Sequence, residues 1–154
     1  MTFDEREFKK ECMKEIEPQI NQELWALGDT VLEECMNYLD NVNKTSDTGA
    51  LAGSGFVQKN EGEVIVTFNS PYAADIEYGT NPHYVDPNDL KPWVRRKLKT
   101  PNADVAKVAR IISNKILFAG TNPQPFLRPS LNKYVAEGKL KYEITGAGEF
   151  TKKR

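Results

Sequence analysis

The sequence has few of the residues that build catalytic and metal centres. It contains one histidine, His83, and two cysteines, Cys12 and Cys35. A single histidine argues against most catalytic arrangements built on imidazole, and two distant cysteines argue against a disulfide framework or a zinc site. Both cysteines fall within helical patterns, so we expect them to be small buried apolar groups.

Long apolar stretches are also absent. No uninterrupted apolar run exceeds four residues, and the N-terminal residues are rich in charge. We therefore expect no transmembrane helix, no secretory signal, no membrane partner and a cytoplasmic protein. The 154 residues, 39% hydrophobic and 28% charged, are typical of one soluble domain. We expect that domain over residues 1–145, followed by a disordered basic tail over residues 146–154.

The net charge of −1 conceals an uneven distribution along the chain. Residues 1–43 hold 11 acidic and 4 basic side chains, residues 44–90 hold 7 and 2, and residues 91–154 hold 4 and 15. Such parts can neutralise each other within the chain or meet between copies of it, or they can be ordinary solvated helix faces. A basic nucleic-acid surface is the weakest reading, because only Trp93 and Tyr134 lie nearby as stacking groups.

Apolar spacing predicts an α+β fold with a long N-terminal helix. A first amphipathic helix over residues 3–16 is expected to end or kink at Pro18. A stripe at steps of three and four then runs through Ile20, Leu24, Leu27, Val31, Cys35, Tyr38 and Val42. Further helices are expected over residues 71–78, 89–98, 104–119 and 129–136.

A small antiparallel sheet completes the predicted fold. Phe56 and Val57 open one strand, a turn follows at residues 60–62, and alternating apolar residues from Val64 to Phe68 form the second strand. Because a lone hairpin is marginally stable, it must lie on the long helix, pair with a later strand or join another subunit. Residues 139–145 alternate as a last strand. Helices packed on this sheet are therefore the expected architecture.

Acidic residues surround the single histidine without forming a ligand pattern. Asp75, Glu77, His83, Asp86 and Asp89 fall close together, but prolines and a glycine break the segment and no known metal-ligand spacing is present. We expect no metal site, no cofactor and no enzymatic activity.

Three short motifs and one helix carry a resemblance. They are Asp47-Thr48-Gly49-Ala50-Leu51, then Tyr72-Ala73-Ala74-Asp75-Ile76-Glu77-Tyr78-Gly79-Thr80, the helix that ends at Gly120, and Pro125-Phe126-Leu127-Arg128-Pro129-Ser130-Leu131. In this order they resemble the tail-completion, or head-to-tail joining, family of long-tailed bacteriophages, typified by the minor tail component of HK-type siphophages. The match spans about residues 45–135. The loop departs from the family at Ala52 and Gly53, where a basic residue is common.

The resemblance implies a structural virion protein at the head-tail junction, present in the host cytoplasm during assembly. It implies a homo-oligomeric ring, with a hexamer as the expected form, that contacts neck or connector proteins and tail-terminator or tail-tube proteins. Genomic DNA would pass through the lumen without sequence-specific binding. The expected interface residues are Tyr72, Asp75, Glu77, Tyr78, Gly79, Thr80, Phe126, Leu127 and Arg128, and the expected flexible docking loop contains Asp47, Thr48, Gly49 and Leu51.

The residues themselves suggest how these motifs work. Glu77 can pair with Arg128, Gly79 supplies a left-handed turn, and Phe126 and Leu127 can anchor the segment between prolines. The alternative for Tyr72, Phe126 and Leu127 is that they fill the core of one subunit. We expect Glu77→Lys to impair joining without unfolding the monomer. Two alternatives stay open: a toxin-like RNase that uses Glu77, His83 and Arg128, and a nucleic-acid-binding module.

Overall fold

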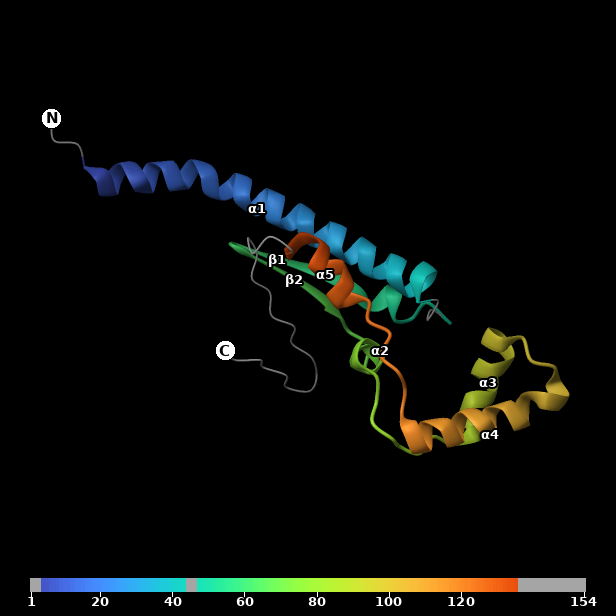
Figure 1. The fold of residues 1–154 in the computed structure, drawn as a ribbon. Coiled ribbons are helices and arrows are strands. Elements are labelled where there is room, and N and C mark those ends of the chain that lie inside the picture. Colours follow the sequence, from blue (N-terminus) through green and yellow to red (C-terminus); the bar gives the residue numbers. More distant parts are fainter. Residues whose placement is uncertain (1–3, 44–46, 136–154) are drawn as a thin grey trace.

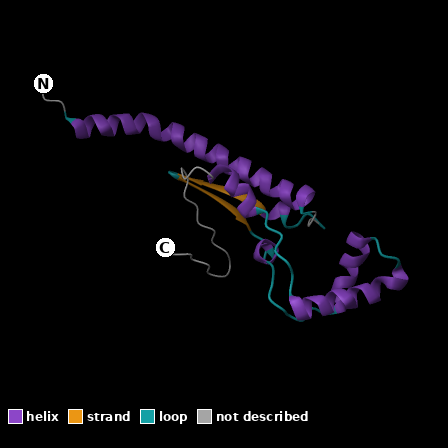
Figure 2. Ribbon diagram, viewed as in Figure 1, coloured by secondary structure: helices purple, strands orange, loops and turns teal. Residues whose placement is uncertain are grey.

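The computed structural model describes residues 4–43 and 47–135, and the strand expected at residues 139–145 and the tail at 146–154 lie outside them. The fold is α+β, as the sequence predicts, with a long N-terminal helix and one two-stranded antiparallel sheet. Figure 2 shows that helices form most of this part of the chain.

The first helix, α1 (Glu5–Asn37), continues into a π-helical turn (Tyr38–Val42). Asp4 caps it, because its carboxylate accepts hydrogen bonds from the backbone N–H groups of Arg6 and Glu7. The sequence left an end or a kink open at Pro18, and the end does not occur, since α1 runs through this residue. Proline removes one backbone donor, but the turns after it are held by contacts with the sheet.

The sheet is the hairpin of β1 (Gly55–Asn60) and β2 (Glu63–Phe68), with Gly55 opposite Phe68 and Asn60 opposite Glu63. It lies along the C-terminal half of α1 (Figure 1). At its turn, Trp25 Nε1 donates to the carbonyl of Asn60 at 3.0 Å, and Gly62 N donates to the Asn21 side chain at 2.8 Å. Of the three arrangements left open by the sequence, the hairpin therefore packs on the long helix.

The main core lies between α1, the hairpin and α5 (Leu127–Val135). Its buried members are Val31, Cys35, Leu39, Leu51 and Phe126. The rings of Phe68 and Phe126 meet edge to face, with centroids 4.9 Å apart. Phe126 is thus a core residue of its own chain.

Two helices further along the chain form a projecting arm. Helix α3 (Pro87–Leu98) packs against α4 (Asn102–Ala119) around Val94, Val105 and Ala109. In Figure 1 this pair, which we call the α3–α4 arm, lies apart from α1 and the hairpin. The two helices bury their apolar faces on each other rather than on the sheet.

Two connecting segments join the arm to the main body, shown in teal in Figure 2. They are bridged where Thr80 and Thr121 exchange backbone hydrogen bonds of 3.1 and 3.2 Å. Gly79 (φ 73°) and Gly120 (φ 67°) stand beside this bridge. A Cβ on Gly120 would collide with the Thr80 carbonyl oxygen, and one on Gly79 would collide with that of Thr121. Only glycine permits this positive φ and this close approach.

The two cysteines differ in environment, which corrects the expectation that both are buried. Cys35 is fully buried and Cys12 is partly exposed. Burial raises the pKa of the Cys35 thiol from 9.0 to about 11. Its neutral form is therefore favoured in the folded protein, and the associated stability is lost as the pH rises through about 11.

We expect native protein at pH 8 to react with a thiol reagent in two phases. Cys12 should react rapidly, because its side chain is accessible, and Cys35 only as fast as the core opens. Mass spectrometry of the alkylated protein measures both rates, with Cys12→Ser as the control that removes the fast phase. Equal rates for the two thiols would contradict the buried position of Cys35.

Candidate functional site

The central feature of the motif region is the carboxylate of Glu77. It sits on α2 (Ala73–Tyr78), a short helix after Pro71 and Tyr72, and the residue is 3% exposed. The helix begins at Ala73 rather than at the expected Pro71. Its single turn and a half cannot hold by propensity alone, so α2 depends on tertiary contacts.

Glu77 binds the start of α5. Its Oε2 accepts hydrogen bonds from the backbone N–H groups of Phe126 and Leu127 at 2.7 and 2.9 Å, and its Oε1 accepts from that of Arg128 at 3.1 Å. These donors belong to the first turn of a helix, where N–H groups lack helical acceptors. A carboxylate here also interacts favourably with the helix dipole.

The predicted Glu77–Arg128 pair is present within the chain. Arg128 Nε donates to Glu77 Oε1 at 2.8 Å, and Arg128 Nη2 donates to the Glu77 carbonyl oxygen at 2.9 Å. The guanidinium carbon lies 4.9 Å from the centre of the Tyr78 ring. These contacts hold the two motifs together as one unit, although Glu77 and Arg128 are 51 residues apart in the sequence. We call the contacts of Glu77 with residues 126–128 the lock.

Further hydrogen bonds join this unit to its neighbours. Gln124 N donates to the Ile76 carbonyl at 2.8 Å, and the Asn43 side chain donates to the carbonyls of Gln124 and Pro125, each at 3.0 Å. The end of α1, α2 and the proline-bounded segment are thus held together. Asn43 was not singled out from the sequence, because nothing local distinguishes it from other loop asparagines.

The other expected interface residues are partly accessible. Tyr72 and Tyr78 are 41% and 38% exposed, Asp75 is exposed, and Thr80 lies in the bridge with Thr121. Leu127 is partly buried and packs against the main core. Tyr72 and Asp75 are therefore the members of the set that the folded chain leaves most open to a partner.

The Asp47-Thr48-Gly49-Ala50-Leu51 loop follows the end of α1. Leu51 is 8% exposed and belongs to the main core, whereas residues 48–50 are exposed. Gly53 N donates to the Gly49 carbonyl at 2.8 Å, and Gly49 has a φ of 75°. The described part of the loop therefore presents a short exposed turn whose C-terminal end is anchored in the core.

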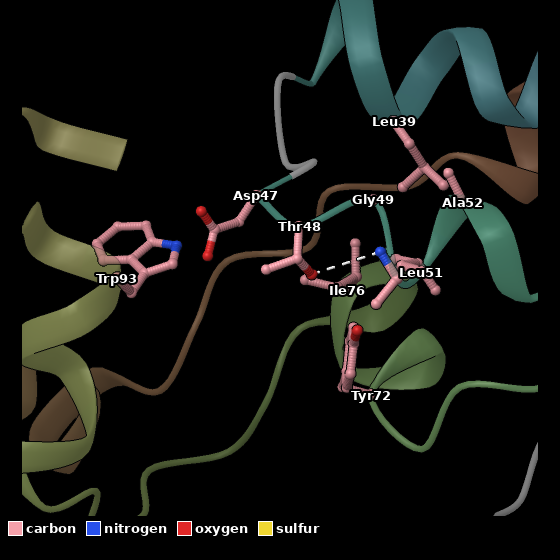
Figure 3. A pocket seen from close by; sticks show the side chains of 10 residues that line it. Leu39, Asp47, Thr48, Gly49, Leu51, Ala52, Tyr72, Ile76 and Trp93 are labelled. Carbon is pink, nitrogen blue, oxygen red and sulfur yellow. Dashed lines mark hydrogen bonds between the residues drawn. The ribbon is translucent and has the colours of Figure 1, made fainter. Parts of the chain in front are cut away.

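This loop also lines an open hollow of about 270 Å³ between the main body and the arm. In Figure 3, Leu39, Leu51 and Ile76 lie on one side and Trp93 on the other, with Asp47 and Thr48 between them. The Asp47 carboxylate accepts two hydrogen bonds from the Arg96 guanidinium, one from Nη2 at 2.6 Å and one from Nε at 3.2 Å. This two-pronged pair connects the loop to the arm.

The hydrogen bonds from Arg96 lower the pKa of Asp47 below its ordinary value of 3.8. The pair is therefore intact above pH 3.8 and is lost as the pH falls through the lowered pKa. We expect Asp47→Asn to increase hydrogen exchange in residues 47–52 and in α3 at neutral pH, with little change in global stability, because the Arg96 side chain is 51% exposed and solvent screens the pair on that side.

Hydrogen-exchange mass spectrometry measures this effect. The matched control is Asp89→Asn, which removes one carboxylate from an exposed position on α3. Unchanged exchange in Asp47→Asn would show that the pair does not restrain the arm.

Of the three residues that the RNase alternative would use, the structure pairs Glu77 with Arg128. His83 Nδ1 donates a hydrogen bond to the Asn81 carbonyl at 2.8 Å, and no contact with Glu77 or Arg128 is found for it in residues 4–43 and 47–135. Trp93 packs on the arm's core and Tyr134 on the main core. In the same described residues, no group of three or more His, Cys, Asp and Glu side chains is placed to hold a metal ion.

No family model, curated protein or solved structure matches the chain. Over the part of the chain that the structure describes, no helix has the length and apolar character to cross a membrane.

Proposed function

We propose that this chain is a structural virion protein of a long-tailed bacteriophage, located at the junction of head and tail. The observation that carries the proposal is the lock between Glu77 and the backbone of residues 126–128. It gives a physical reason for the residue types of both motifs on which the resemblance rests. Glutamate supplies the acceptors, and the proline-bounded segment supplies the donors.

The chemistry of the lock favours a structural role. Both Glu77 oxygens already accept hydrogen bonds, and the residue is almost completely buried. A general acid or base must exchange a proton with a substrate within hydrogen-bond reach. Glu77 instead holds α2 and α5 at a fixed distance, as a rigid building block of an assembly requires.

In the proposed assembly, copies of the chain form a ring, with a hexamer expected, between neck or connector proteins and the tail-terminator or tail-tube proteins. The elongated shape in Figure 1, with α1 extending one way and the arm the other, leaves separate surfaces for neighbouring subunits and for other rings. A ring needs two unlike contact surfaces on each subunit. Genomic DNA would pass through the lumen without base-specific contacts.

Deletion of the gene from the phage that carries it tests this function. We expect filled heads and separate tails in electron micrographs, and restored particles when the wild-type chain is supplied in trans. Mass spectrometry of purified virions should detect the protein. Normal joined particles from the deletion strain, or virions without the protein, would refute the proposal.

A further inference from the structure

The N-terminal half of α1 carries an apolar stripe that the other described residues leave open. The hairpin reaches along α1 only to Asn21, through Gly62. Beyond it, Ile16 and Ile20 are 46% and 51% exposed, and Met13 is 42% exposed. We call Cys12, Met13, Ile16 and Ile20 the α1 stripe. A helical segment of this length is marginal by itself, so a packing partner would stabilise it.

Carboxylates border this stripe. Glu11 and Glu15 are four residues apart and both are exposed. In residues 4–43 and 47–135 neither forms an ion pair. The partner that fits the α1 stripe therefore combines apolar side chains with cations.

The side of α4 that faces away from α3 combines exposed apolar side chains with cations. Ile111 and Phe118 are 58% and 80% exposed, and Lys107 and Lys115 are exposed beside them. Helical geometry places these four residues, which we call the α4 face, within one side of the helix, away from the buried Val105 and Ala109. Within the described residues the two lysines form no ion pair.

The helical segments that carry the two surfaces are also similar in length and lie at opposite ends of the molecule. Residues 5–20 of α1 span about 24 Å and the 18 residues of α4 about 27 Å at 1.5 Å per residue. Figure 1 shows the N-terminal half of α1 and helix α4 at opposite ends, so they cannot meet within one chain. They can meet only between copies, in a head-to-tail contact that closes into a ring.

We propose that the α1 stripe of one subunit packs against the α4 face of the next subunit, with Phe118, the most exposed apolar side chain of that face, as the main anchor. Glu11 and Glu15 then oppose Lys107 and Lys115 and fix which surfaces meet. This inference rests on the proposed ring, and it names the surfaces that build it. Pairing of two α4 faces is disfavoured, because it would bring four lysines together.

A charge-exchange experiment tests the contact. Glu11→Lys with Glu15→Lys places cations on both surfaces of one variant, and Lys107→Glu with Lys115→Glu places carboxylates on both surfaces of the other. We expect each variant alone to associate at least tenfold more weakly than wild type in analytical ultracentrifugation. An equimolar mixture should recover assembly, because every contact then joins unlike charges.

The matched control is Glu33→Lys with Asp40→Lys, which makes the same charge change at exposed positions near the other end of α1. It should assemble as wild type does. Phe118→Ala should weaken assembly at least tenfold without changing the circular dichroism of the monomer. A carbodiimide cross-linker should join Glu11 or Glu15 to Lys107 or Lys115 between wild-type copies, as mapped by mass spectrometry.

The outcomes separate this contact from the ring itself. Wild-type oligomers that none of the variants weakens, or cross-links confined to α1 with α1, would overturn the contact and leave a ring through other surfaces. A mixture that stays dissociated would overturn it as well. A wild-type chain that remains monomeric and uncross-linked near 1 mM, a concentration far above that needed for a stable ring, would overturn both the contact and self-assembly of the isolated chain.

Discussion

Replacement of Glu77 with alanine is expected to lower the free energy of unfolding by about 3 to 5 kcal/mol. The change removes the acceptor for the backbone N–H groups of residues 126–128 and leaves Arg128 without its carboxylate. Most of the loss comes from the buried N–H groups, because the Arg128 side chain is 41% exposed and its charge stays partly solvated. Urea denaturation followed by circular dichroism measures the change.

Two variants control this result. Asp75→Ala removes an exposed carboxylate from the same short helix and should change the unfolding free energy by less than about 0.5 kcal/mol. Glu77→Gln keeps one carbonyl acceptor and should fall between Asp75→Ala and Glu77→Ala. Equal stability of Glu77→Ala and wild type would show that the lock is unimportant for folding.

The same geometry corrects one expectation from the sequence. Glu77→Lys was expected to impair joining while leaving the monomer folded. The structure places the side chain at 3% exposure against three N–H donors, so a lysine there would bury a cation beside Arg128. Any assembly defect of Glu77→Lys would therefore follow from misfolding, and it cannot serve as an interface variant.

Replacement of Phe126 with alanine is expected to destabilise the protein by about 3 to 5 kcal/mol. Its side chain is the largest of the fully buried ones in the described residues, and its ring meets Phe68 edge to face. Truncation would leave a cavity between α1, the hairpin and α5, and would loosen the segment that Glu77 binds. Thermal and urea unfolding measure the loss.

Phe118→Ala provides a matched comparison, since it makes the same truncation at a position that is 80% exposed. Its unfolding free energy should change by less than about 0.5 kcal/mol. The two variants thus separate a phenylalanine that holds the subunit together from one that is proposed to hold subunits to each other. A Phe126→Ala variant as stable as Phe118→Ala would contradict the assigned core.

Several features of the fold follow from local sequence. The apolar spacing from Ile20 onward predicts the long helix, and the turn at residues 60–62 predicts the hairpin. Glycines predict the ends of α2 and α4, and both have a positive φ. At Gly79 the ψ of −180° differs from the left-handed helical cap that was expected. These predictions succeed because periodicity, turns and glycine geometry depend on neighbours within a few residues.

Other features depend on distant contacts. Pro18 is tolerated because the rest of α1 packs on the hairpin, and residues 87–119 form an arm because α3 and α4 cover each other. The sequence predicted the pairing of Glu77 with Arg128, but not that three backbone N–H groups would share the same carboxylate. Backbone directions at residues 126–128 follow from where α5 begins, which local propensity does not determine.

By itself, the sequence determined the types and approximate bounds of most of the described helices and strands, the acidic and basic parts of the chain, and the pair of charged residues that joins two motifs. Only the tertiary structure decided which apolar residues are buried in the core and which remain exposed to solvent. Phe126 and Phe118 look alike in sequence, since each stands next to a leucine in a short apolar stretch. Their roles differ because the burial of a side chain depends on which other helices and strands pack against it. This packing is a property of the whole folded chain.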